Sequence, residues 1–298
     1  MTHQEFKQQI CQALQSALGS QVRVTVQDIV KNNNTHLSGL TVLSDRCNVS
    51  PTIYLDPYYR KYQNGTSLSD ICEEILNVYQ ENQPTDSIDV SFFTDYDRIK
   101  SRIVFKLVNY EKNGQLLKDI PYYRFLDLAV VFNCLLEYDS NGSATILIRN
   151  QHMKFWNITA DDLYALAMQN TPALLKYDLR NMTEILKEFL TETEFKELSS
   201  YGSHPCTMYM LSNRLKLNGS VCILYPDLLK SFAEHIQSDL YILPSSVHEV
   251  LLLPADGQSS SQELSDMVRE VNHSQLSREE ILSDHIYYYS RDTCQITM

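Results

Sequence analysis

Hydrophobic residues recur every three or four positions in several stretches of the chain, which is the spacing of one face of an α-helix. The first of these stretches covers residues 4–18. The clearest one runs from Ser67 to Tyr79. Ser67 is a suitable N-cap residue, and Pro84 lies beyond the end of the stretch. The same spacing predicts further helices, two of them with capping-box patterns, that begin near Thr159, Met182, Pro226, Gln262 and Ser277-Arg278.

Other stretches alternate hydrophobic and polar residues with a period of two, which is typical of β-strands. Residues 22–26 and 37–42 alternate on either side of a run of asparagines and predict a hairpin. The almost continuous apolar residues 125–136 and 144–148 predict two central strands joined by a tight turn, although the first run is long enough to be helical. Further strands are expected at 88–92, 103–108, 207–211, 221–224, 240–243, 247–253 and 286–289.

These elements together predict an α+β protein. Asn113-Gly114 and Pro121 interrupt the pattern, so we expect a domain boundary near residue 118. Domains 1–118 and 119–298 would each contain a small mixed or antiparallel sheet with packed helices. A length of 298 residues, 43% of them hydrophobic, is sufficient for two such cores.

The net charge of the chain argues against some classes of binding partner. The 25 Lys and Arg residues against 37 Asp and Glu give a net charge of −12, and no basic stripe is present. This acidic balance argues against nucleic acid and against anionic membrane surfaces as partners. No apolar run approaches the roughly 18 residues that span a bilayer, and the first residues lack the features of a signal peptide. We therefore expect a cytoplasmic protein.

The cysteines and glycines predict neither a metal site nor a cofactor. Seven scattered cysteines include no Cys-x-x-Cys pair, and the eight glycines form no phosphate-binding loop. His204, Cys206 and Cys222 could approach one another across a hairpin, but a fourth ligand is missing. The acidic residues between 86 and 97 lack the order of a calcium-binding loop.

Reactive side chains are densest at Ser245, Ser246, His248 and Glu249. A serine nucleophile needs a base and an orienting acid, and all three residue types occur here. However, His248 and Glu249 would point to opposite faces of a strand, and the Gly-x-Ser-x-Gly elbow is missing. In the alternative interpretation the segment after Pro244 turns the chain between two strands, and a serine hydroxyl binds the local backbone.

Tyrosine is unusually frequent, with 19 residues against ten phenylalanines and one tryptophan. Because its side chain combines apolar area with a polar tip, clusters of tyrosine suit protein interfaces, although strands and surface helices also favour it. The candidate contact residues are Tyr58, Tyr59, Tyr62, Tyr287, Tyr288 and Tyr289.

Five segments carry a resemblance to a known family: YILPSSVHEV (241–250), NVSPTIYL (48–55), RFLDLAVVF (124–132), AMQNTP (167–172) and MVREVN (267–272). The chain resembles, over essentially its whole length, an uncharacterised family, a domain of unknown function of gut-dwelling clostridial bacteria. The resemblance implies a bacterial origin and supplies no activity, cofactor or catalytic residue.

The sequence favours a cytoplasmic binding or accessory protein that acts through protein contacts. One alternative is a hydrolase-like enzyme that uses Ser245 or Ser246 with His248 and an acid from elsewhere in the chain. The other is a sensor that holds a small ligand in a cleft between the domains. An enzyme should place His248 beside a serine hydroxyl at a concave, solvent-reachable site, whereas a binding protein should expose a contiguous apolar and tyrosine-rich patch.

Overall fold

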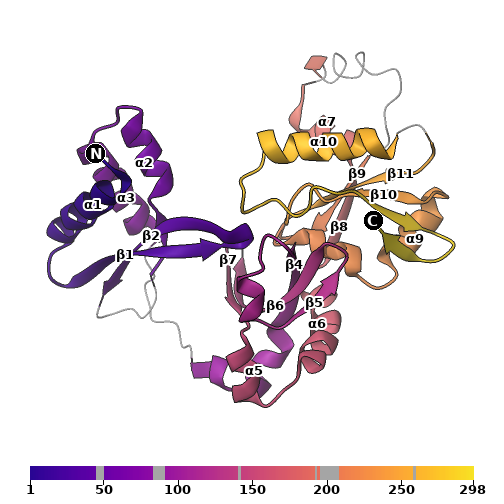
Figure 1. Ribbon diagram of the computed structural model, residues 1–298, viewed down its shortest axis with the longest axis horizontal. Helices are drawn as coiled ribbons and strands as arrows, with labels where there is room; N and C mark the ends of the chain where they lie inside the picture. Colours follow the sequence, from indigo (N-terminus) through magenta and orange to yellow (C-terminus); the bar gives the residue numbers. More distant parts are fainter. Residues whose placement is uncertain (45–49, 83–90, 140–141, 192, 195–207, 258–259) are drawn as a thin grey trace. The chain divides into compact units, whose positions relative to one another are not determined.

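The computed structural model describes residues 1–44, 50–82, 91–139, 142–191, 193–194, 208–257 and 260–298 (Figure 1). It separates into two units, Met1–Phe92 and Phe93–Met298. Helices pack on open antiparallel sheets in both units, which confirms the α+β prediction. Among the described residues, no helix has the length and apolar composition needed to cross a bilayer.

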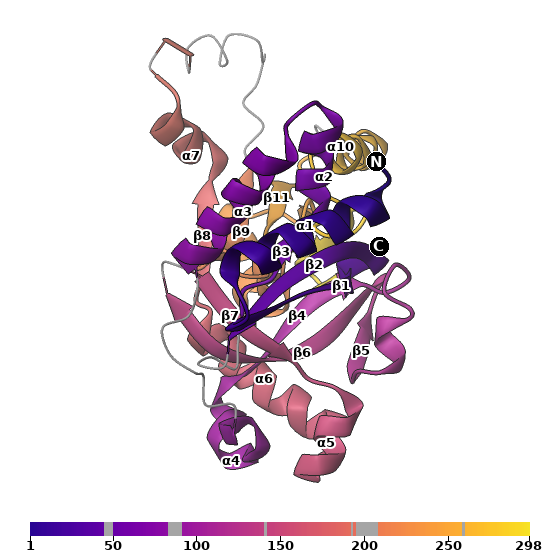
Figure 2. The same ribbon diagram turned by 90° about the vertical axis from the view of Figure 1, so that its left-hand side faces the viewer.

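In the first unit, helices pack on a small sheet (Figure 2). Its elements are α1 (His3–Leu18), β1 (Val22–Lys31), η1 (Asn32–Asn34), β2 (Thr35–Ser44), β3 (Ile53–Tyr54), α2 (Asp56–Gln63) and α3 (Leu68–Asn82). The sheet order is β1-β2-β3, and both pairings are antiparallel. The predicted helices at both ends of this unit and the hairpin between them are confirmed.

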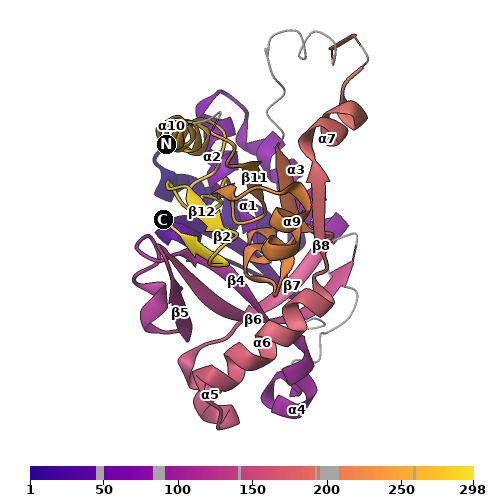
Figure 3. The same ribbon diagram turned by 90° about the vertical axis from the view of Figure 1, so that its right-hand side faces the viewer.

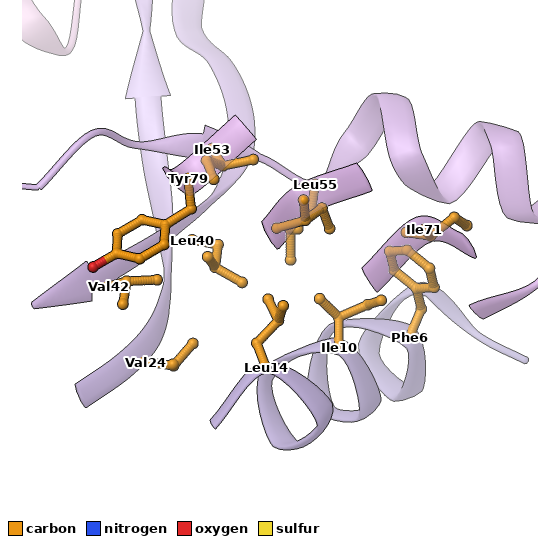
Figure 4. Close-up of a cluster of buried hydrophobic side chains, with 11 residues drawn as sticks. Phe6, Ile10, Leu14, Val24, Leu40, Val42, Ile53, Leu55, Ile71 and Tyr79 are labelled. Atoms are coloured by element: carbon orange, nitrogen blue, oxygen red, sulfur yellow. The ribbon is translucent and has the colours of Figure 1, made fainter. Parts of the chain in front are cut away.

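The core of this unit explains why its helices form where the periodicity predicts them. Figure 4 shows Phe6, Ile10 and Leu14 of α1 pointing into one apolar cluster with Leu40 of β2 and Ile71 of α3. The α1 helix begins at a capping box formed by Thr2 and Glu5. At the start of α3 the backbone N–H of Asp70 donates to Ser67 Oγ at 3.2 Å.

The second unit has a four-stranded sheet with β6 at its centre. Its strands are β4 (Ile103–Asn109), β5 (Tyr122–Phe125), β6 (Leu128–Asp139) and β7 (Gly142–Leu147), and all three others pair with β6. The nearby helices are α4 (Tyr96–Ile99), α5 (Asn150–Trp156) and α6 (Ala160–Leu174). Thr171 Oγ1 of α6 accepts a hydrogen bond from the backbone N–H of Phe105 at 3.1 Å, which ties α6 to β4.

The division between the units differs from the boundary predicted near residue 118. The strand β4 pairs with β6 along its whole length, so the chain divides at Phe92 and Phe93 instead. The Asn113-Gly114 signal marks a turn inside the second unit, where the N–H of Gly114 donates to Glu111 O at 3.2 Å. A turn signal alone does not distinguish a connection within a domain from a linker.

The second unit also contains a six-stranded antiparallel sheet, in the order β13-β12-β10-β11-β9-β8. Its strands are β8 (Tyr177–Asn181), β9 (Tyr209–Asn213), β10 (Leu240–Leu243), β11 (Val250–Pro254), β12 (Tyr287–Ser290) and β13 (Gln295–Thr297). The helices are α7 (Met182–Phe189), α9 (Leu228–Ile236) and α10 (Ser261–Ser274). Figure 3 shows α9 beside β8 and the predicted helix α10 on the same unit.

Several predicted elements are wrong in detail. Residues 221–224 belong to the 3₁₀ segment η5 (Gly219–Leu224) and not to a strand, because a short, mostly buried apolar run does not reveal its own period. The helix α9 starts after Asp227, so Pro226 lies outside it. The predicted strand at 88–92 falls mostly outside the described residues, and its described end belongs to the 3₁₀ segment η2 (Ser91–Thr94).

The helix expected from Arg278 is replaced by a turn. Its capping contact does form, since Ser277 Oγ donates to Glu280 Oε2 at 2.7 Å. The chain leaves the turn where Leu282 and Ser283 become fully buried. Tertiary burial therefore overrides the local capping signal here.

Candidate functional site

The outer edge of β1 is open in the first unit. This strand lies at one end of its sheet and, among the residues that the structure describes, pairs with β2 alone. At its start, Gln15 of α1 substitutes for a strand partner: Gln15 Nε2 donates to Val22 O and Gln15 Oε1 accepts from the N–H of Val24, both at 3.0 Å. The backbone groups of Val22 and Val24 therefore point to this edge.

The open edge continues past the part that Gln15 covers. Alternate residues of an antiparallel strand direct their backbone groups to the same side, so Val26, Asp28 and Val30 face the edge as well. Their outward N–H and C=O groups make no hydrogen bond to the described part of the chain. Such an edge is a template for pairing with another extended segment.

A hollow of about 390 Å³ runs along this edge, between α1 and β1. Figure 2 shows α1 beside the β1–β2 hairpin. The residues that line the hollow, here called the edge groove, are Gln4, Lys7, Gln8, Cys11, Gln12, Val26 and Asp28. It is lined mainly by polar side chains from one face of α1 and by the exposed end of β1.

Three glutamines form a row on the α1 side of the edge groove. Gln4, Gln8 and Gln12 are four residues apart, so they share one helix face. Their side-chain amides make no hydrogen bond to the described residues. Each amide offers both a donor and an acceptor, as a peptide group does.

The charges in the edge groove compensate each other. Lys7 Nζ lies 3.3 Å from Asp28 Oδ1, and the Lys7 side chain is only 16% exposed. Cys11 Sγ donates to Val24 O at 3.5 Å. Burial raises the pKa of the Cys11 thiol above its usual value, which disfavours the reactive thiolate. The edge groove is therefore equipped for hydrogen bonding and not for nucleophilic chemistry.

The predicted serine and histidine side chains lie in the loop between β10 and β11, and the structure does not bring them together. Ser246 is 2% exposed, and its Oγ donates to Glu249 Oε1 at 2.7 Å. The same oxygen accepts from the N–H groups of His248 and Glu249, at 3.0 and 3.3 Å. His248 Nδ1 lies 3.0 Å from Lys216 O, and a carbonyl only accepts, so this nitrogen carries a proton.

This loop is held by neighbouring serines on both of its central carbonyls. Ser212 Oγ donates to His248 O at 2.7 Å, and Ser220 Oγ donates to Val247 O at 2.8 Å. Ser245 bonds through its backbone N–H to Leu243 O at 3.0 Å. The arrangement matches the turn interpretation, in which a serine hydroxyl binds the local backbone.

The tyrosines of α2 lie against the core of the first unit. The rings of Tyr59 and Tyr62 are 5.3 and 5.7 Å from the ring of Phe6, and Tyr59 Oη donates to Met1 O at 3.1 Å. Tyr58 is partly buried against the same core. These contacts fasten α2 to α1.

The three consecutive tyrosines of β12 are mostly internal to the second unit. Tyr287 and Tyr289 are 0% and 4% exposed. Tyr287 Oη donates to Asp127 Oδ1 at 2.6 Å, and Tyr288 Oη donates to Asp239 Oδ2 at 2.6 Å. Of the three tyrosines, Tyr288 is the one that is only partly buried.

The buried phenol of Tyr287 should make the fold less stable at alkaline pH. Burial, followed by the charge of Asp127, raises its pKa far above the usual value of 10.0. A group whose pKa is raised by folding stabilises the fold fully below its unfolded pKa and loses that contribution as the pH rises further. Above pH 10 we expect stability to fall by up to about 1.4 kcal/mol per pH unit from this tyrosine. Urea midpoints measured from pH 8 upward should fall less steeply in Tyr287→Phe, and equal slopes would contradict the assignment.

The described residues contain no group of three or more His, Cys, Asp or Glu side chains that could hold a metal ion. His204 and Cys206 lie outside the described residues. Cys222 is fully buried, and its Sγ donates to Ser212 O at 3.2 Å. Burial raises the pKa of this thiol to about 12, so it is protonated at physiological pH.

Comparison with known proteins assigns the chain to a family. Residues 3–291 match DUF5688, a family of unknown function. The chain belongs to this family. No curated protein and no solved structure matches it. The role of this DUF5688 protein is therefore argued from the chemistry of its own residues.

The edge groove of this DUF5688 protein is not among the sites predicted from the sequence. The spacing of Gln4, Gln8 and Gln12 was a usable signal, because a helix face that carries three uncharged amides beside a strand is suited to backbone hydrogen bonding. The open edge itself depends on which strands pair with β1, and this information is not local in the sequence.

Proposed function

We propose that this DUF5688 protein is a protein-binding module that takes an extended segment of another protein as an added strand beside β1. The observation that carries the proposal is the open edge at Val26, Asp28 and Val30 next to the edge groove. In strand addition, main-chain hydrogen bonds provide the affinity and the groove selects the side chains. As expected from the sequence, the proposed function is binding through protein contacts. The proposed contact surface is a strand edge and not the tyrosine clusters.

The lining of the edge groove favours a polar, uncharged segment. The amides of Gln4, Gln8 and Gln12 can donate to and accept from a peptide backbone or a Ser, Thr, Asn or Gln side chain. Lys7 and Asp28 neutralise each other, so the groove has no preference for a charged partner.

The same lining argues against a second copy of this chain as the partner. Val26 is the one aliphatic residue among those that line the edge groove. Stable homodimer interfaces are typically large and rich in apolar area, whereas strand addition by a short segment needs neither.

The test uses peptides of ten residues, the length of β1, selected from a random phage-displayed library on the immobilised full chain. Asp28→Pro removes an outward N–H that does not pair with β2, so the sheet should survive while strand addition is blocked. We expect selected peptides to bind Asp28→Pro at least about tenfold more weakly than Asp28→Ala, by fluorescence polarisation. Gln8→Ala should weaken binding by about threefold to tenfold, the value of one or two neutral hydrogen bonds.

Asp28→Ala is the matched control, because it also loses the Lys7 ion pair but keeps the N–H group. Circular dichroism should show that both variants keep the fold. Equal peptide affinity of the two variants, or no peptide enriched above an unrelated acidic protein, would contradict the proposal. A dimer of Asp28→Ala that Asp28→Pro lacks, by size exclusion with light scattering, would instead identify a second copy as the partner.

The other functions considered from the sequence find less support. Ser246 Oγ donates a hydrogen bond to Glu249, and His248 Nδ1 is bonded to the carbonyl of Lys216, so a hydrolase would need both contacts to rearrange. A sensor that uses a cleft between domains stays a prediction. The gut clostridial origin and the cytoplasmic location stay predictions as well.

A further inference from the structure

A hollow of about 610 Å³ lies in the second unit, far in sequence from the edge groove and independent of the function proposed for it. It is bounded by the end of α6, the start of β8, the turn after β9 and the start of α9. Its volume is within the range of about 300–1,000 Å³ that small-ligand sites occupy. The residues used below, here called the charged pocket, are Lys176, Tyr177, Asp178, Arg214, Asp227 and Ser231.

Two cations stand opposite each other in the charged pocket. Tyr177 of β8 pairs with Asn213 of β9, and the N–H of Arg214 donates to Lys176 O at 2.9 Å. Lys176 and Arg214 are therefore the next cross-strand pair, with side chains on the same face. Like charges in that position repel each other, and neither forms an ion pair with a described residue. An anionic group between them would relieve this repulsion.

The same hollow also contains carboxylates. Asp178 lies two residues after Lys176 on β8, and Asp227 precedes the first residue of α9. Asp227 makes no side-chain cap for α9, and neither carboxylate forms an ion pair with the described residues. The charged pocket thus offers two positive and two negative groups that form no ion pair with one another.

The walls of the charged pocket are fixed by backbone and buried contacts. Tyr225, which contributes to the lining, is 5% exposed, and its Oη donates to Leu175 O at 2.6 Å. The N–H of Ser231 donates to Asp227 O at 2.9 Å. Tyr177, the residue between Lys176 and Asp178, also contributes to the lining and is half-exposed.

We propose that the charged pocket binds a small zwitterion of the amino-acid class, that is, a free amino acid or a dipeptide. Its carboxylate lies between Lys176 and Arg214, and its ammonium group is accepted by the carboxylates of Asp178 and Asp227. The side chain of the ligand rests on the two prolines of the lining, Pro172 and Pro226. A ligand with both charges can pair with all four groups, whereas a simple anion pairs only with Lys176 and Arg214.

The test is a thermal-shift screen of the full chain with the free L-amino acids and a set of dipeptides, followed by calorimetric titration of each compound that raises the midpoint. At least one compound should bind. Its N-acetyl derivative and its C-terminal amide, each lacking one charge, should bind at least about tenfold more weakly. Arg214→Gln should lose binding by a similar factor of about ten. Without ligand the same variant should unfold about 1 to 2 °C higher, because the repulsion with Lys176 is gone.

Arg269→Gln is the matched control, since Arg269 is an exposed arginine of α10 paired with Asp266 outside the pocket. It should bind the ligand as the wild-type chain does. The proposal is overturned if no compound of the panel binds, if Arg214→Gln binds unchanged, or if the N-acetyl derivative or inorganic phosphate binds as tightly as the free amino acid. The last outcome would make the hollow a simple anion site.

Discussion

Asp127→Ala is expected to destabilise the second unit by about 3 to 5 kcal/mol, as the loss of a buried, multiply bonded carboxylate does. Asp127 lies at the turn between β5 and β6 and is 15% exposed. Its Oδ1 accepts from Tyr287 Oη at 2.6 Å, and its Oδ2 accepts from Ser283 Oγ at 2.6 Å and from His285 Nδ1 at 3.2 Å. One carboxylate therefore fixes the segment that leads into β12.

The expected cost comes chiefly from the partners that the substitution leaves behind. Ser283 and Tyr287 are fully buried, so their hydroxyls would lose an acceptor without gaining water. His285 is half-exposed and can turn to solvent. Urea unfolding followed by tyrosine fluorescence measures the loss, and Asp127→Asn should fall between the wild-type chain and Asp127→Ala because an amide still accepts one bond.

A double-mutant cycle provides the control for this prediction. Tyr287→Phe removes one of the stranded hydroxyls, so Asp127→Ala should cost at least about 1 kcal/mol less in that background than in the wild-type chain. A cost of Asp127→Ala below about 1 kcal/mol, or additive effects of the two changes, would show that this cluster does not hold the segment.

Most helices and strands could be predicted because their signals are local. The stripe of apolar residues on α1 and the capping contact of Ser67 both lie within a few turns of chain, and both appear in the structure. The start of β11 was predicted three residues too early for an equally local reason. The hydroxyl of Ser246 accepts the N–H groups of the next residues, which closes a turn where the apolar pattern favoured a strand.

The clusters that join distant segments could not be predicted. His285 and Asp127 are 158 positions apart, and no spacing rule relates them. The contacts of the tyrosines also could not be predicted. Their clustering was visible in the sequence, but whether Tyr59 faces a partner or the side chain of Phe6 depends on how α2 packs on α1. Composition and spacing do not carry that information.

Part of each candidate site can be predicted from nearby residues in the sequence, and part depends on how distant strands pair. The glutamine row of α1 is readable from a spacing of four, whereas the freedom of the β1 edge depends on the sheet order. The opposed cations of the charged pocket need the register of β8 on β9, since Lys176 and Arg214 have no relation in the sequence. Strand pairing therefore determines both the edge groove and the charged pocket. It sets which backbone groups are already hydrogen-bonded and which charged side chains lie opposite each other.

Gly219→Ala is expected to destabilise the second unit by about 3 kcal/mol, at the upper end of the usual cost of overpacking. A Cβ at this position would lie 2.4 Å from His248 O and 2.8 Å from the backbone N of Asn213. It would also lie 2.2 Å from Ser212 Oγ, the group that donates to His248 O. A side chain can rotate away from such a contact, but these two backbone atoms belong to neighbouring strands and loops that would have to separate.

The separation should be visible at the loop between β10 and β11. In Gly219→Ala the amide groups of residues 247–249 should exchange with deuterium faster than in the wild-type chain, because the bonds from Ser212 and Ser220 to this loop loosen. Gly114→Ala is the matched control: its nearest neighbour would be Glu111 O at 3.5 Å, an ordinary contact, so it should change the unfolding free energy by less than about 0.5 kcal/mol. Equal costs for the two alanines, or unchanged exchange of the loop, would mean that η5 moves freely against β9 and that the close approach at Gly219 does not position the Ser246 turn.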